Sequence, residues 1–73
     1  MSSKRIAVDT ASKKGQLFKV SEYGGRFYVY KVSVGFFSDD LNKLGESRSL
    51  EDAIQIIKAF AGGSVRDIRI SEW

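Results

Sequence analysis

The sequence predicts a small two-layer α+β domain, in which a mostly antiparallel sheet of three to five strands carries one α-helix on one face. Three observations predict this fold: residues 49–63 have apolar side chains at helical spacing, other stretches alternate as strands do, and glycines separate them. The element order is strand, strand, strand, a weaker fourth strand, helix, strand, which two layers can satisfy. We expect one domain over residues 1–73, with residues 1–3 disordered.

The first strand is predicted over Lys4–Ala11. Ile6 and Val8 point to one side of this strand, whereas Arg5 and Asp9 point to the other. A strand that mixes apolar and charged residues in this way is typical of a sheet edge, where charged side chains stay in solvent. We therefore expect an edge strand that ends in the polar turn before Gln16.

The clearest strands are Gln16–Tyr23 and Arg26–Val34, which are joined by Gly24-Gly25. Two glycines between strands suit the positive φ angles of a two-residue hairpin loop. Such a loop pairs Tyr23 with Arg26, Ser21 with Tyr28, Lys19 with Tyr30 and Leu17 with Val32. The opposite, helix-facing side then carries Phe18, Val20, Phe27 and Val29.

A three-residue loop is the alternative. It would slip the pairing by one residue, so that Tyr28 and Tyr30 would share the core face with Phe18 and Val20. We prefer the two-residue loop, which places the tyrosines on the face away from the helix. A bulge near Val34–Gly35 is another place where the strand could change faces.

Residues 35–47 give the weakest pattern in the chain. Asp39-Asp40 is predicted as the tip of a turn, and Leu41–Glu46 as a short fourth strand. The two adjacent aspartates could also be imagined as a carboxylate pair or as metal ligands. Adjacent residues on a strand point to opposite faces, however, so the turn is the preferred interpretation.

The helix is predicted over Ser49–Ala61. Ser49 is the expected N-cap, Asp52 sits three residues later as in a capping box, and Gly62-Gly63 supplies a positive-φ residue at the end. One side of the helix carries the apolar stripe that we expect to be buried, formed by Leu50, Ala53, Ile54, Ile57, Phe60 and Ala61.

The last strand is predicted over Val65–Trp73. Ile68 and Ile70 are expected to face inward, with Asp67 and Arg69 facing outward.

Composition excludes several classes of function. The chain has neither His nor Cys, so we expect no enzyme, metal site or cofactor. No segment approaches the ~20 apolar residues that cross a bilayer, so we expect no membrane association and a cytoplasmic protein. The net charge of +3 comes from residues 1–14, because the remaining residues carry eight bases and eight acids.

The expected function is interaction through the uncovered sheet face, either with a protein partner or with a second copy. That face would expose an apolar patch of Leu17, Tyr28, Tyr30 and Val32, with Phe36 or Phe37 nearby. The alternative is single-stranded nucleic-acid binding, because aromatic rings stack on bases and basic side chains meet the backbone. The candidate binding residues for either function are Lys19, Tyr23, Arg26, Tyr28 and Tyr30.

Overall fold

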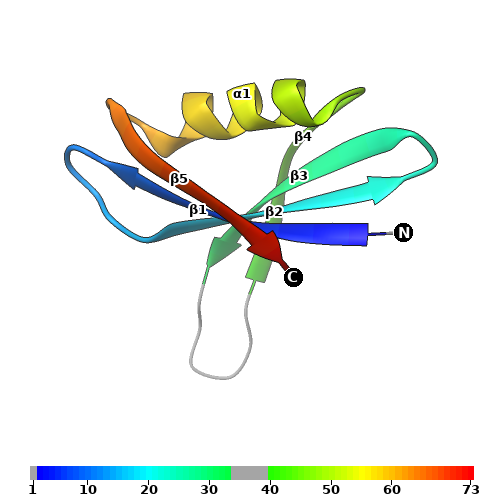
Figure 1. The fold of residues 1–73 in the computed structure, drawn as a ribbon, viewed down its shortest axis with the longest axis horizontal. Helices are drawn as coiled ribbons and strands as arrows, with labels where there is room; N and C mark the ends of the chain where they lie inside the picture. Colours follow the sequence, from blue (N-terminus) through cyan, green and yellow to red (C-terminus); the bar gives the residue numbers. More distant parts are fainter. Residues whose placement is uncertain (1, 34–39) are drawn as a thin grey trace.

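The computed structural model describes residues 2–33 and 40–73 and has five strands and one helix in two layers (Figure 1). All strand pairs are antiparallel, and the sheet order is β4-β3-β2-β1-β5. The predicted α+β fold, with one helix across one face of the sheet, is therefore confirmed. The elements are β1 (Ser2–Thr10), β2 (Gln16–Tyr23), β3 (Arg26–Ser33), β4 (Asp40–Ser47), α1 (Leu50–Ala61) and β5 (Val65–Glu72).

β1 is not an edge strand, so the prediction of its place was wrong. It lies between β2 and β5, and Ile6 and Val8 are fully buried. The reason is the return of β5, whose Ile70 and Ile68 lie opposite Ile6 and Val8. The expectation that residues 1–3 are disordered also fails for the serines at positions 2 and 3, which begin β1 and pair with β2.

The β2–β3 hairpin has the predicted two-residue loop. Gly24 and Gly25 have φ angles of +59° and +78°, as the mirror-image turns that match strand twist require. Tyr23 pairs with Arg26, and the register continues from there to Leu17 and Val32 as predicted. Every second residue of both strands therefore faces the helix, and the tyrosines lie on the other side.

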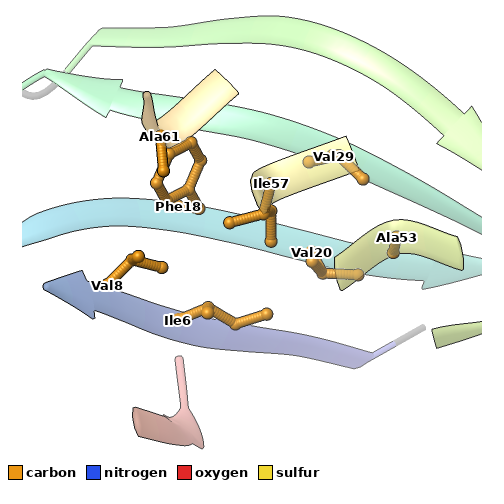
Figure 2. Packing of buried hydrophobic residues seen from close by; sticks show 8 residues of the cluster. All are labelled: Ile6, Val8, Phe18, Val20, Val29, Ala53, Ile57 and Ala61. Atoms are coloured by element: carbon orange, nitrogen blue, oxygen red, sulfur yellow. The ribbon is translucent and has the colours of Figure 1, made fainter. Parts of the chain in front are cut away.

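The core lies between α1 and the middle of the sheet (Figure 2). α1 packs mainly against β2, β3 and β4. The buried residues of the cluster are Ile6, Val8, Phe18, Val20, Val29, Ala53, Ile57 and Ala61. Phe27, the remaining predicted core residue of the hairpin, is half-buried against them.

Ser49 is the N-cap of α1, as predicted, and its Oγ accepts a hydrogen bond of 3.2 Å from the backbone N–H of Asp52. Gly62, with φ of +72°, follows its last residue. The predicted stripe is wrong at Phe60, which is 58% exposed. The helix is instead rotated so that Ile56 is half-buried against the core, and a Cβ added to Gly45 of β4 would lie 3.5 Å from Ile56 Cδ1.

The fourth and fifth strands also differ in detail from expectation. Asp40 begins β4 rather than forming a turn tip. The described residues do not include Asp39, the suggested bulge at Val34–Gly35, or the two candidate patch residues Phe36 and Phe37. Ile68 packs against the core, but Ile70 is 47% exposed. Ile70 does point to the helix side, yet β5 is an edge strand beyond the strands that α1 chiefly contacts.

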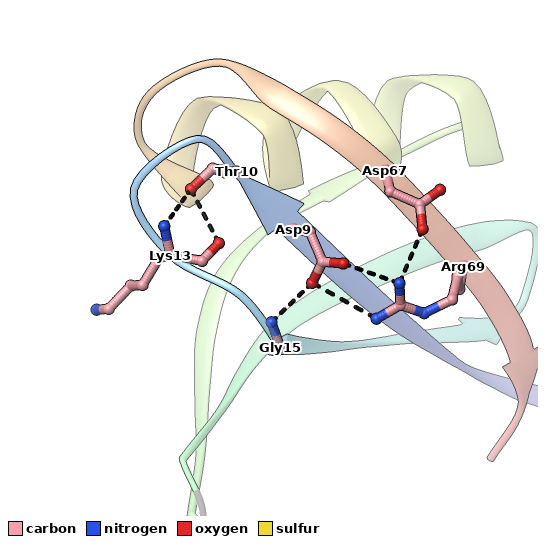
Figure 3. Close-up of polar contacts among 6 residues, drawn as sticks. All are labelled: Asp9, Thr10, Lys13, Gly15, Asp67 and Arg69. Atoms are coloured by element: carbon pink, nitrogen blue, oxygen red, sulfur yellow. Dashed lines mark hydrogen bonds and ion pairs between the residues drawn. The ribbon is translucent and has the colours of Figure 1, made fainter.

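An ion cluster ties β5 to β1 near the β1–β2 turn (Figure 3). Arg69 Nη1 lies 2.9 Å from Asp9 Oδ2 and 2.8 Å from Asp67 Oδ2, and the backbone N–H of Gly15 donates to Asp9 Oδ1 at 2.8 Å. These hydrogen bonds, the one from Arg69 first, hold the pKa of the Asp9 carboxyl below its ordinary value.

Candidate functional site

The sheet face away from α1, called the outer face below, holds all five candidate binding residues. Lys19 and Tyr23 project from β2, and Arg26, Tyr28 and Tyr30 project from β3. The register makes Lys19 the direct neighbour of Tyr30, and Tyr23 the neighbour of Arg26. Basic and aromatic side chains therefore alternate across the two central strands, as the two-residue loop predicts.

A shallow hollow of about 460 Å³ opens on the outer face. One of its lining residues is Ser21, a small residue with Lys19 and Tyr23 two positions away along β2. Tyr28, on the next strand, lies directly opposite Ser21. Ser21 has the shortest side chain among the lining residues, and the others are long. The hollow is lined by Lys19, Ser21, Tyr23, Tyr28, Tyr30, Leu41 and Lys43.

Arg26 is the one candidate residue that does not line the hollow. Its Nη1 lies 3.5 Å from Glu46 Oε2, and Lys43 Nζ lies 3.7 Å from Glu46 Oε1. All three side chains are substantially exposed, and exposed ion pairs of this kind contribute about 0–1 kcal/mol. A phosphate could therefore replace Glu46 at little cost.

Trp73 belongs to this surface, although it was not among the predicted site residues. Its backbone N–H donates to Ser3 O at 3.2 Å, which fixes the residue beside β1. Arg5 Cζ lies 5.0 Å from the centroid of the indole ring, and Lys19 Nζ lies 4.7 Å from it. Both distances fit cation–π interactions. Trp73 is in step with Arg69, which was predicted to face outward, so strand alternation alone could have placed it here.

Lys43 was also missed. It lies opposite Tyr30 on β4, and its Nζ is 5.1 Å from the centroid of the Tyr28 ring. β4 contains an extra residue opposite the Val29/Tyr30 step of β3, so a simple alternation pattern could not assign its faces. Only the paired structure shows that Lys43 joins the tyrosines.

Two basic side chains of the outer face, Arg5 and Lys19, lie apart from its acids, whereas Arg26 and Lys43 pair with Glu46. Arg5, Lys19 and Lys43 lie among the aromatic rings. In the described ranges 2–33 and 40–73, no carboxylate oxygen lies within 4 Å of a charged nitrogen of Arg5 or Lys19. Asp9 is engaged by Arg69 instead. The middle of the outer face is therefore electropositive and aromatic.

The predicted apolar patch is smaller than expected. Val32 is only 5% exposed, and Leu17 is half-buried, so neither offers much surface to a partner. Leu41, which pairs with Val32 from β4, is 42% exposed. Of the described residues at this end of the outer face, Leu41 thus exposes more apolar surface than Val32 or Leu17.

Among the described residues, no group of three or more His, Cys, Asp or Glu side chains could hold a metal ion. α1 is too short to span a membrane. The chain matches no protein-family model, and no match was found among curated proteins or solved structures. Function must therefore be inferred from the outer face itself.

Proposed function

We propose that the protein binds single-stranded nucleic acid through the outer face. The observation that carries this proposal is the gathering of aromatic rings and basic side chains on one open surface. Arg5 and Lys19 both lie against the Trp73 ring, and Lys19 also lines the tyrosine-lined hollow. A strand of nucleic acid needs both partners, a ring for each stacked base and a cation for each phosphate.

The shape of the surface favours a single strand over a duplex. Duplex DNA is commonly read by a helix or a two-stranded ribbon that enters the major groove. The helix α1 lies on the opposite side of the sheet, so the outer face offers no such element (Figure 1). An open sheet instead lets unstacked bases lie against its rings, with stacking worth about 1–3 kcal/mol for each base.

The salt dependence follows from the number of available cations. Arg5, Lys19 and Lys43 are the basic side chains that lie against aromatic rings of this face. If each contacts one phosphate, the logarithm of the affinity should fall with the logarithm of the salt concentration with a slope of about −2. Arg26 would make the slope steeper where it exchanges Glu46 for a phosphate.

The test is a titration with a short mixed-sequence single-stranded oligonucleotide. Trp73 is the only tryptophan, so its fluorescence reports directly on stacking at this face. Amide shifts should map to residues 16–23 and 26–33. Tyr28→Ala should weaken binding by about fivefold to a hundredfold, the range that one lost stacking contact predicts, without unfolding the domain.

Phe60→Ala is the matched control, because it also removes an exposed aromatic ring, but from the helix layer. It should leave the affinity unchanged. Shifts confined to residues 4–14 would mean that only the basic leading segment meets the polyanion, and absence of binding at low salt would overturn the proposal outright.

Association with a second copy or a protein partner is the second candidate, and Leu41 is the observation that favours it. A two-fold contact through this face would bring the cations of both copies together, which is unfavourable. We therefore rank it second. Light scattering across a hundredfold dilution would reveal a dimer of twice 8.2 kDa. Leu41→Lys should dissociate it, whereas a constant monomer would exclude the homodimer.

A further inference from the structure

Ser21 contributes a hydroxyl group to the lining of the hollow. Its Oγ lies 3.1 Å from Ser3 Oγ on the neighbouring strand, and this hydroxyl pair is partly buried. Two hydroxyls together offer two donors and four acceptor lone pairs. Their mutual hydrogen bond uses one of each, so the pair still offers one O–H donor and three lone pairs to a ligand.

The sides of the hollow combine aromatic and cationic groups. Tyr28 and Tyr30 come from β3, Lys19 from β2 and Lys43 from β4. Among residues 2–33 and 40–73, the side chains that line it include no carboxylate. The cavity volume falls within the range of about 300–1,000 Å³ that is usual for small-molecule sites. A ligand that suits this lining is aromatic, anionic and polar at the edge of its ring.

A nucleotide has all three properties. On the basis of the proposed function, we infer that the hollow holds one nucleotide of the bound strand. Its base stacks on a tyrosine ring and meets the Ser21 hydroxyl with its polar edge, while its phosphate is bound by Lys19 or Lys43. Ser3 acts as a positioning residue that orients the Ser21 hydroxyl. This nucleotide anchors the strand, and it gives the protein a base preference that a general stacking surface lacks.

The inference is tested with single nucleotides. The probes are the four nucleoside 5′-monophosphates, the corresponding nucleosides and inorganic phosphate, each titrated against labelled protein. A monophosphate should shift the amides of Ser21, Tyr28 and Tyr30 and should bind more tightly than its nucleoside. Inorganic phosphate should leave the Ser21 amide in place.

Two substitutions separate filling of the hollow from loss of the hydroxyl. Ser21→Leu should abolish these shifts and weaken oligonucleotide binding about tenfold, while the remaining face, including Trp73, still binds. Ser33→Leu makes the same change at an exposed β3 position on the other side of the sheet, and should have no effect. Ser21→Ala keeps the hollow open, and should reduce the differences in affinity among the four monophosphates.

The outcomes distinguish this inference from the proposed function. If the oligonucleotide binds but the monophosphates shift only the lysines, as inorganic phosphate does, the anchoring nucleotide is wrong and the proposed function stands. An unchanged ranking of the four bases in Ser21→Ala would show that the hydroxyl does not read the base. If no oligonucleotide binds, both proposals fail. Thermal unfolding of each variant confirms that it is folded.

Discussion

Truncation of two apolar residues on the same helix should destabilise the domain to very different extents. Ile57 is fully buried beneath α1, whereas Phe60, three residues later on the same expected stripe, is 58% exposed. Ile57→Ala leaves a cavity in the core and should cost about 2–5 kcal/mol of unfolding free energy. A domain of this length has a total of only about 4–11 kcal/mol, so the loss is large.

Phe60→Ala removes a larger side chain but should cost less. A fully enclosed Phe buries about 150–250 Å², and Phe60 withdraws less than half of that, roughly 80 Å² or about 2 kcal/mol of burial. Three effects reduce this cost. The unfolded chain already buries part of the same apolar area, the Cβ of Ala would stay partly buried, and Ala has a higher helix propensity than Phe. The expected net cost is therefore about 1 kcal/mol or less.

Urea unfolding followed by far-ultraviolet circular dichroism measures both values, and thermal midpoints should differ by about 4–8 °C for each kcal/mol in a domain of this size. The comparison requires that the free energy of unfolding fall with urea concentration at the same slope in both variants. If Phe60→Ala cost as much as Ile57→Ala, Phe60 would be a core residue, as the simple helical stripe predicts. The rotation of α1 described above would then be wrong.

Two other stability predictions follow from the turn and from the ion cluster. Gly25→Ala should cost about 1–2 kcal/mol of unfolding free energy, because an L residue is strained at φ of +78°. Gly45→Ala should be nearly neutral, because the added Cβ would make only ordinary contacts. The thermal midpoints of the two variants test this difference. The Asp9 carboxyl stabilises the fold above its ordinary pKa of 3.8, and that contribution is lost as the pH falls through its lower folded-state pKa. Asp9→Asn should therefore lower the urea midpoint near neutral pH. This difference from the unaltered protein should vanish in acid. A difference that stays the same at every pH would refute the role of the Arg69 contact.

The parts of the fold that were predicted correctly are those that depend on nearby residues. The N-cap at Ser49 needs only the following turn, and the hairpin register needs only Gly24-Gly25 and the flanking strands. The place of β1 depends on β5, which pairs with it from the far end of the chain. Local alternation contains no information about such a partner, so the sequence pattern predicts an edge for what is an interior strand.

The helix rotation shows the same limit at the level of packing. An apolar stripe at spacings of three and four spans a wide arc, and it does not decide which flank contacts the sheet. Here Gly45 leaves room on β4 for Ile56, and Phe60 stays in solvent. Whether Ile56 or Phe60 packs against the sheet thus depends on Gly45 of β4, the strand with the weakest sequence pattern.

The candidate site is assembled from the whole sheet, which is why only part of it could be predicted. The five predicted residues all come from the one hairpin whose register is local. Arg5, Lys43 and Trp73 reach the same surface from β1, β4 and the end of β5, and only the strand order brings them to it.

A site built from every strand exists only in the folded chain. A ligand that bridges Trp73 and Lys43 would contact opposite edges of the sheet at once, and the unfolded chain would have almost no affinity for it beyond its charge. Binding should therefore raise the stability of the domain in proportion to the logarithm of ligand concentration above the dissociation constant. A polyanion held only by the basic leading segment would give little such stabilisation, because those cations are equally available when the sheet is unfolded. The coupling between binding and stability thus follows from the strand order. The same strand order is the reason why the sequence alone predicts only part of the site.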